Sequence, residues 1–327
     1  MPRSPAKSAP RRAARPAPAS SASFAALPTE AIHPESGDLD IRPPEDVVKL
    51  MLDEEIGGVR AARARAAVIA RAASLVAARL AAGGRLVYAG AGTSGRLGTL
   101  DAAECVPTFG IPPSRVAAVI AGGPAALTRS IEGAEDNARD AEGRMRRIAV
   151  GPTDVVCCIA ASGVTPFVHS ALEYARFRRA ATIFVTCSPP ENAADLADVV
   201  IDVPTGPEVI SGSTRLKAGT ATKVVLNAIS TTAFVLLGKT YAGLMVDVRP
   251  TNAKLWARAT RIVNLLTGLD EETARALIEK AGGRAKVAIV MHHARVSAAR
   301  ARELLIQHKG SLRAIIGDVV PGSTTLP

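Results

Sequence analysis

The stretch "GAGTSGRLGTLDAAEC", residues 90–105, follows the apolar run Leu86 to Ala89 and contains a literal G-x-G-x-x-G. Glycines after a buried strand predict a tight turn into a helix, whose first backbone N–H groups can bind a phosphate. Dinucleotide-binding folds also place an acidic residue about twenty residues further on, at the end of the second strand. Here that strand ends in "AVIAGG", residues 118–123, without an acid. The motif therefore favours one phosphate over a dinucleotide.

The sequence around this motif predicts a doubly wound α/β fold with a five-stranded parallel sheet. Short apolar segments alternate with helical ones, which is typical of parallel strands buried on both faces. The expected strands are residues 86–91, 116–121, 154–161, 182–187 and 199–203. The expected helices are one from about residue 43 to the Gly83-Gly84 pair, then 125–147, 167–178 and 218–239.

Composition divides the chain into three parts. Residues 1–28 are rich in Ala, Pro, Ser and Arg and predict a disordered basic tail, because they cannot bury enough apolar surface to fold. Residues 29–250 hold the predicted sheet, and residues 251–327 predict a helical C-terminal subdomain.

The net charge of +10 lies partly in that tail, and aromatic residues make up only 3% of the chain. Neither feature predicts a nucleic-acid-binding surface. The longest apolar stretch is too short to span a membrane, so we expect a soluble protein without a membrane partner, and the cysteines below favour the cytoplasm. Four cysteines without ligand spacing predict core residues in a reducing compartment, and no metal site is expected.

A second hydroxyl-rich turn, "AASGVTPF", residues 160–167, follows the third expected strand. Taken alone, either turn is explained by Ser and Thr capping a helix. If the two strands are neighbours, however, both turns open onto the crevice where the sheet reverses its winding. Together they predict a clamp for one monophosphate, built from Thr93, Ser94, Gly95, Ser162, Gly163 and Thr165.

These turns and several longer stretches resemble a known family. The stretches are "YAGAGTSGRLGTLDAAECVPTFG", "IEGAEDNARD", "ASGVTPFVHSALEYAR", "GPEVISGSTRLKAGTATK" and "GLMVDVRPTNAKLWARA". The two turns resemble the SIS (sugar isomerase) domain, and the longer motifs resemble the N-acetylmuramic acid 6-phosphate etherases. The resemblance runs from about Thr29 to Asp318. One departure is Val164, where many relatives carry Arg, so no phosphate contact from that side chain is expected.

The resemblance implies a lyase of cell-wall sugar recycling that removes D-lactate from N-acetylmuramic acid 6-phosphate, acting as a homodimer without a cofactor. It implies Glu104 as the proton donor and Glu135 as the base, and it gives the pair more firmly than the division of roles. Burial would raise the pKa of Glu104. Glu132 and Glu135 are expected to share a helix face, so spacing alone does not choose between them.

A straight helix would hold Glu104 roughly 15 Å from Ser94, at about 1.5 Å per residue. Either the chain bends between them or Glu104 serves a neighbouring subunit. A further segment offers hydroxyls and charges for substrate oxygens or the lactyl carboxylate, at Glu208, Ser211, Ser213, Arg215 and Lys217. The two cations of this segment are equally explained as a solvated helix start.

Two other functions remain open at this point. An aldose-ketose phosphosugar isomerase would also need a carboxylate base at carbon 2, but it would release no lactate. A phosphosugar-sensing regulator resembling the glucokinase regulatory protein would be non-catalytic and would carry two SIS domains, whereas one α/β unit is visible here.

Overall fold

The computed structural model describes residues 27–188, 195–319 and 322. The predicted tail, residues 1–28, lies outside the described residues except for its last two positions. Within the described ranges, no helix combines the length and apolar character needed to cross a bilayer.

Five parallel strands form one sheet in the order β2-β1-β3-β4-β5. Their bounds are Leu86–Gly90 for β1, Val116–Ile120 for β2, Val155–Ile159 for β3, Ala181–Thr186 for β4 and Val199–Asp202 for β5. The short 3-10 helix η1, Pro113–Arg115, leads into β2. The predicted doubly wound five-stranded sheet is therefore confirmed, with each strand within two residues of its expected ends.

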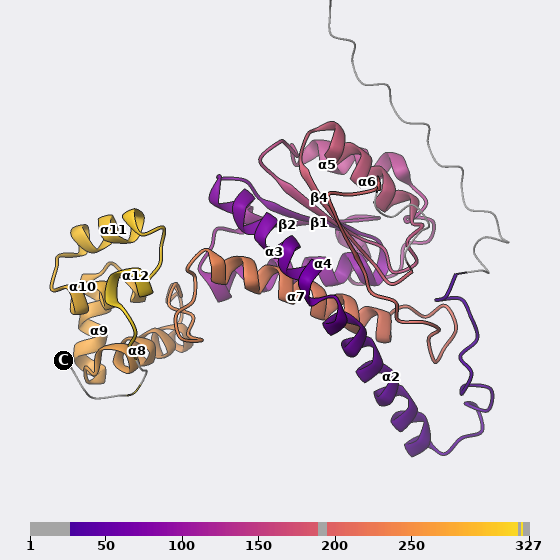
Figure 1. Ribbon diagram of the computed structural model, residues 1–327, viewed down its shortest axis with the longest axis horizontal. Helices are drawn as coiled ribbons and strands as arrows, with labels where there is room; N and C mark the ends of the chain where they lie inside the picture. The colour runs from indigo at the N-terminus through magenta and orange to yellow at the C-terminus, as the bar shows by residue number, and fades with distance from the viewer. Residues whose placement is uncertain (1–26, 189–194, 320–321, 323–327) are drawn as a thin grey trace, which may run out of the picture.

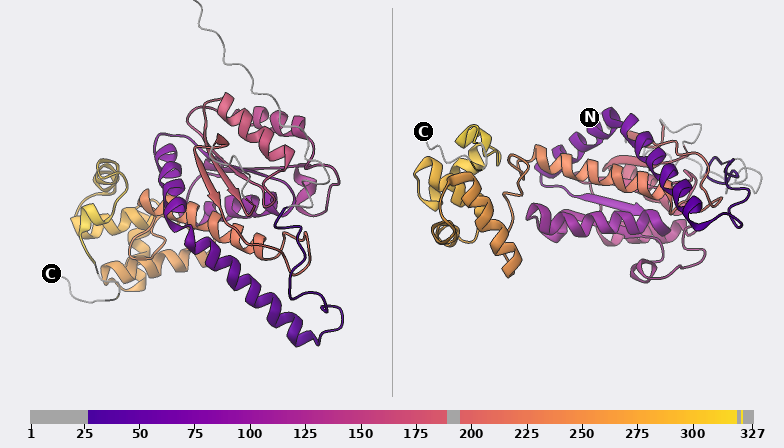
Figure 2. Two further views of the ribbon diagram at one scale, coloured as in Figure 1. Left: turned by 45° about the vertical axis from the view of Figure 1, so that its right-hand side comes forward. Right: turned by 90° about the horizontal axis from the view of Figure 1, so that it is seen from below.

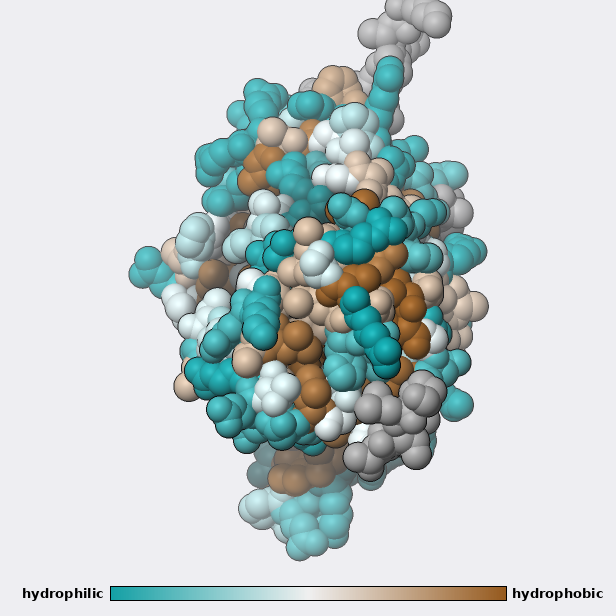
Figure 3. Space-filling model, turned by 90° about the vertical axis from the view of Figure 1, so that its left-hand side faces the viewer, coloured by the Kyte–Doolittle hydropathy of each residue, from teal (hydrophilic) through white to brown (hydrophobic). Residues whose placement is uncertain are grey.

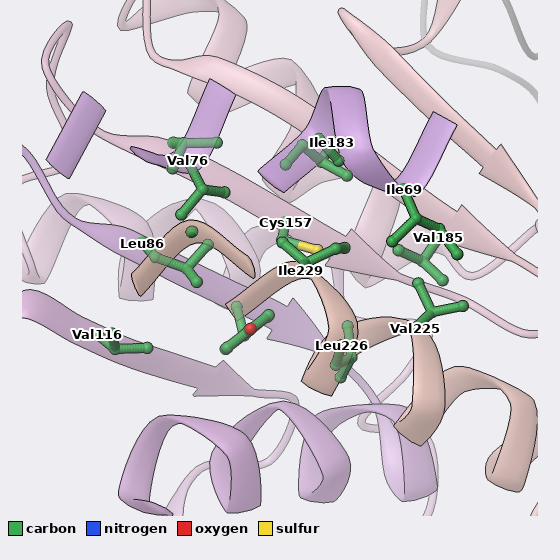
Figure 4. Close-up of a cluster of buried hydrophobic side chains, with 14 of the residues drawn as sticks. Ile69, Val76, Leu86, Val116, Cys157, Ile183, Val185, Val225, Leu226 and Ile229 are labelled. Atoms are coloured by element: carbon green, nitrogen blue, oxygen red, sulfur yellow. The ribbon is translucent and has the colours of Figure 1, made fainter. Parts of the chain in front are cut away.

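Helices cover both faces of the sheet (Figure 1 and Figure 2). On one face lie α3, Ala66–Ala81, α4, Gly92–Phe109, and α7, Lys217–Leu236. On the other lie α5, Ala138–Arg147, and α6, Pro166–Phe177. Because side chains alternate along a strand, Leu86 and Tyr88 of β1 join the first core while Val87 and Ala89 join the second. Figure 4 shows the first core, where Ile229 of α7 lies close to Cys157 of β3.

The N-terminal helical region is two helices, so the expectation of one continuous helix was wrong. Helix α2, Pro44–Ala64, ends at Arg65, and α3 begins at the next residue. The Arg65 guanidinium donates to the carbonyl of Asp202 at 2.6 Å and to its carboxylate at 2.8 Å. This contact fixes the break between the helices at the end of β5, and Figure 1 shows α2 running on past the sheet.

The helix predicted over residues 125–147 is also shorter than expected. A 3-10 helix, η2 at Pro124–Leu127, is followed by turns, and α5 begins only at Ala138. Gly133 has a φ of 67°, in the left-handed region that interrupts a helix. Glu132 and Glu135 therefore lie in turns, and the expected shared helix face is wrong.

The C-terminal part is helical, as predicted, and has a core of its own. Its helices are α8, Ala253–Thr267, α9, Glu271–Lys280, α10, Ala285–Ala294, α11, Ala298–Gln307, and the short α12, Arg313–Ile316. That core includes Tyr241, Val246 and Val248, which precede the expected boundary at residue 250. Figure 1 shows these helices grouped beyond the C-terminal end of α7, and Figure 3 shows apolar areas among hydrophilic side chains at this end of the molecule.

Candidate active site

The two hydroxyl-rich turns follow adjacent strands of the sheet. Strands β1 and β3 pair directly, with Gly90 opposite Ile159 at their carboxyl ends. From this pair the chain goes to β2 on one side and to β4 on the other. The turns therefore open at the switch point of the sheet, where α/β proteins form a ligand-binding crevice. The predicted adjacency is confirmed.

The first turn depends on two glycines that let strand and helix approach closely. A Cβ on Gly90 would lie 2.8 Å from the backbone nitrogen of Gly95, and a Cβ on Gly95 would lie 2.6 Å from Ile120. Residue Ala91 precedes α4 without a capping side chain. Thr93 and Ser94 are half-buried in the first turn of α4, and neither hydroxyl has a hydrogen-bond partner among the described residues. Hydroxyls and helix N–H groups are thus both available to an anion.

The second turn is held in shape by its backbone. Gly163 has a φ of 81°, and its carbonyl lies 2.8 Å from Nε2 of His169 on α6. Thr165 precedes α6 but makes no side-chain cap there. The hydroxyls of Ser162 and Thr165 are also without partners within the described part of the chain. Helix capping, the alternative reading of these hydroxyls, does not occur at either turn.

The turn that carries Glu135 lies beside the second hydroxyl turn. The backbone N–H of Phe167, in the first turn of α6, donates to the carbonyl of Glu135 at 2.9 Å. On the other side, Ile131 and Ala134 come within 3.1–3.3 Å of the position that a Cβ on Gly122 would occupy, just past β2. The exposed Glu135 is therefore held at the carboxyl edge of the sheet, next to the second hydroxyl turn.

Glu104 lies further along α4 and is exposed on this chain, so the burial considered for it does not occur here. Helix α4 is continuous from Gly92 to Phe109, and its Pro107 comes after Glu104. No bend therefore brings Glu104 back toward Ser94, and about 15 Å of helix separates them. The sequence left two possibilities, a bend in the chain or a Glu104 that serves a neighbouring subunit. The bend is not present in the structure.

Asp101, one turn before Glu104, is a buried anchor that the sequence did not reveal. Its carboxylate accepts hydrogen bonds from Tyr88 at 2.6 Å, from Asn227 at 2.7 Å and from Ser230 at 3.0 Å. Burial, followed by the Asp101 charge, raises the pKa of Tyr88, so the phenol stays a donor. These contacts join β1 and α7 to α4 and fix the helix that carries Glu104.

Two residues expected to bind substrate, Glu208 and Lys217, make contacts that hold the start of α7. Glu208 is fully buried, and its two carboxylate oxygens accept from the backbone N–H groups of Lys217 at 3.1 Å and Ala218 at 3.0 Å. Burial raises the pKa of Glu208, although these two hydrogen bonds act to lower it. Glu208 has no exposed surface in this conformation, and its contact with substrate stays a prediction.

Lys217 is likewise occupied, because its buried ammonium pairs with Glu54 of α2. Burial would raise the pKa of Glu54, but Lys217 and then His33, whose Nε2 lies 3.3 Å away, together lower it. In this conformation the Lys217 ammonium is held by Glu54, and its contact with substrate stays a prediction. This His33–Glu54–Lys217 network was missed because its members lie far apart in the chain and no local pattern links them.

Other residues between Glu208 and Lys217 lie close to the first hydroxyl turn, and some of their side chains have no partner among the described residues. A Cβ on Gly219 would lie 3.6 Å from the Thr93 methyl, which places the start of α7 beside the start of α4. Arg215 is exposed and has no ion-pair partner among the described residues. Ser213 is half-buried, whereas the Ser211 hydroxyl donates to the carbonyl of Glu30 at 2.7 Å.

All four cysteines are free and buried in the cores. Burial raises the pKa of Cys187 to about 11, which disfavours its thiolate form. Within the described ranges, no three His, Cys, Asp or Glu side chains gather as a metal site would require. That no metal or cofactor takes part stays a prediction.

Comparison with known proteins identifies the family. Two family models match, the N-terminal SIS domain of glucokinase regulatory protein over residues 67–176 and the SIS domain over residues 130–231. Among solved structures, a phosphoheptose isomerase from Neisseria gonorrhoeae aligns at 19% identity with a TM-score of 0.43, over 57% of this chain and 97% of its own.

Curated relatives agree over nearly their whole length. A protein of Gloeobacter violaceus named N-acetylmuramic acid 6-phosphate etherase is 53% identical over 266 residues, covering 81% of this chain and 87% of its own. A protein of the same name from Rubrobacter xylanophilus is 49% identical over 292 residues, covering 89% and 96%. Identity this high over both chains leaves one conclusion: the chain belongs to the N-acetylmuramic acid 6-phosphate etherase family.

Proposed function

We propose that this chain is a lyase that cleaves the D-lactyl ether of N-acetylmuramic acid 6-phosphate, giving N-acetylglucosamine 6-phosphate and D-lactate in cell-wall sugar recycling. The observation that carries the proposal is the agreement with named etherases along almost the whole of both chains. The crevice between the two hydroxyl turns supports it, because free hydroxyls and helix N–H groups suit a sugar 6-phosphate.

The chemistry needs one base and one acid. In the open-chain aldehyde form of the sugar, the proton on carbon 2 is acidic and the ether on carbon 3 is β to the carbonyl. Glu135 takes that proton, the carbon–oxygen bond breaks, and Glu104 protonates the departing lactyl oxygen. Water then adds to the resulting double bond and restores the hydroxyl at carbon 3. The position of Glu135 beside the second hydroxyl turn supports the role of base.

We further propose that the acid comes from a second copy of the chain. Glu104 is exposed, and a continuous helix separates it from Ser94 by about 15 Å. A homodimer would supply both carboxylates to each crevice. A candidate pairing surface is the stripe of large apolar side chains on α2, each more than 40% exposed: Val48, Leu52, Ile56 and Val59. Their spacing places them on one helix face.

Three other features belong to this proposal. We place the protein in the cytoplasm, where its buried free thiols would stay reduced. The division into a sheet domain, residues 29–250, and a helical subdomain, residues 251–327, is supported by their separate cores, with the boundary moved to about residue 240. Arg215 is the cation left to meet the lactyl carboxylate.

The test is incubation of the full-length protein with N-acetylmuramic acid 6-phosphate in deuterated water. We expect D-lactate and N-acetylglucosamine 6-phosphate in equal amounts, with deuterium at carbon 2. A ketose phosphate without lactate would point to an isomerase, and tight binding without turnover would point to a regulator. Either result would reject the proposed reaction. Equal turnover of the unphosphorylated sugar would reject the phosphate clamp.

A further inference from the structure

A cavity of about 420 Å³ lies far from the hydroxyl turns. Its wall includes Gly110, which follows the C-terminal end of α4, and Lys239, which follows that of α7. The first hydroxyl turn lies at the opposite end of α4, and the opposite end of α7 lies beside it. Since α4 has 18 residues, about 25 Å of helix separates the two locations. The remaining wall comes from residues 246–249, from α10 with the preceding Arg284, and from α11 with the following residues 309–310.

Cationic side chains dominate this wall. Six of them line the cavity, and Asp247 is the one carboxylate among the lining residues. They are Lys239, Arg249, Arg284, Lys286, Arg302 and Lys309. Because like charges repel, such a concentration is stabilised by an anion between them.

Asp247 neutralises only part of this charge. Its carboxylate lies 2.8 Å from the ammonium of Lys239 and 3.5 Å from that of Lys286. Lys286 is buried, and burial lowers its pKa although Asp247 opposes the shift. Arg249 and Arg284 have no carboxylate partner among the described residues, and neither has Lys309. Half of the cations are therefore free to bind a ligand.

The backbone adds donors on the same wall. Helix α10 begins at Ala285, and the preceding Arg284 provides no side-chain cap. Ala285, Lys286 and Val287, the first turn of α10, all line the cavity. The N–H groups of a first helical turn lack partners within the helix and favour a negative charge. Cationic side chains and the start of a helix thus line one open cavity.

We infer that this cavity is a second binding site, for the dianion of a phosphate monoester or of free phosphate. The volume of about 420 Å³ suits a small molecule. A dianion matches several cations, and guanidinium groups pair with phosphate oxygens in two-pronged geometry. The site lies on the same chain as the substrate crevice but at the other end of α4 and α7, so both can be filled together.

Calorimetric titration of the full-length protein tests this inference at constant ionic strength. Ser94→Ala/Ser162→Ala is the background, because it weakens the phosphate clamp of the crevice. The probes are inorganic phosphate and N-acetylglucosamine 6-phosphate. We expect this background to retain one binding event per chain, and Arg249→Gln/Arg284→Gln added to it to weaken that event by about tenfold or more. Whichever of the two probes binds more tightly at this cavity shows whether its ligand is free phosphate or a phosphosugar.

The control removes the same charge elsewhere on the helical subdomain. Arg261→Gln/Lys280→Gln changes two exposed side chains that do not line the cavity, and it should leave binding within about twofold. Absence of binding in the Ser94→Ala/Ser162→Ala background would overturn the inference. An equal loss in both charge variants would also overturn it, because general attraction would then explain the binding. The wild type should show a further binding event at the hydroxyl turns. If the serine substitutions do not weaken that event, the phosphate clamp proposed for the crevice is rejected.

Discussion

The two ends of α4 and α7 differ in how their polar groups are held. At the carboxyl edge of the sheet, Lys217 is buried against Glu54 while the hydroxyls of Ser94 and Ser162 have no partners within the described part of the chain. At the opposite end, Arg249 and Arg284 are free around a cavity. The first end therefore offers oriented hydroxyls and N–H groups, which select a ligand by geometry, and the second offers charge, which selects mainly by sign.

The largest effect is expected from the carboxylates at the first end. Glu135→Gln keeps the size and hydrogen-bonding reach of the side chain but removes its basicity. Turnover should fall by about 10²- to 10⁴-fold, and exchange of the carbon 2 proton with solvent deuterium should stop. Glu104→Gln should block lactate release while retaining part of that exchange. Proton NMR in deuterated water measures both reactions in one sample.

The neighbouring Glu132→Gln is the matched control, since it lies in the same exposed turn and carries the same charge. It should behave as the wild type. Loss of activity in Glu132→Gln with normal activity in Glu135→Gln would exchange the two assignments.

The next largest effect concerns the free hydroxyls. Ser94→Ala and Ser162→Ala each remove one hydrogen bond to a charged phosphate, worth about 1.5–3 kcal/mol, so KM should rise roughly ten- to hundredfold. Ser74→Ala removes an exposed hydroxyl that bonds only within α3 and should change nothing. A fall in kcat at constant KM would place these serines in the chemistry instead of in phosphate binding.

The ion pair between Glu54 and Lys217 should contribute to the free energy of unfolding. Glu54→Gln leaves a buried ammonium with a weaker partner and should cost about 1.5–3 kcal/mol at pH 7. The folded-state pKa of Glu54 lies below its ordinary value of 4.5, so this contribution is present at neutral pH and disappears as the pH falls through the folded-state pKa. Thermal melts of variant and wild type should therefore converge in acid.

Glu45→Gln, in an exposed pair with Lys49 on the same helix, is the control and should shift the melting temperature little at any pH. A difference between Glu54→Gln and wild type that stays constant from pH 7 to acid would contradict the assigned role of the ion pair.

The smallest effect is expected from the tail. Its composition predicts that it neither folds nor docks, so deletion of residues 1–28 should leave turnover and melting temperature nearly unchanged. A clear loss of either would show that the tail contacts the folded part of the chain or a second copy.

The sequence predicted those features that depend on local pattern. The strands were found because each is a short apolar run, and both hydroxyl turns because their glycines and hydroxyls are adjacent in the chain. The break between α2 and α3 at Arg65 was missed because a contact with the distant Asp202 sets it. The turns before Ala138 were missed because they depend on the left-handed conformation of Gly133.

The charged groups of the site were the least predictable. Whether Lys217 and Glu208 face substrate depends on partners elsewhere in the fold, and the capping and ion-pairing roles emerged only from the structure. The family motifs supplied Glu104 and Glu135, and no spacing rule would have selected them.

The central claim, that each crevice takes Glu135 from one chain and Glu104 from another, is tested most directly by mixing two inactive variants. Co-expressed Glu104→Gln and Glu135→Gln chains should form mixed dimers in which one crevice carries both substitutions and the other carries neither. With random pairing, lactate release should recover to about a quarter of the wild-type rate, while each variant alone stays inactive. If both carboxylates act within one chain, every crevice in the mixture keeps a substitution. Mixed dimers that release no more lactate than the separate variants would contradict the account.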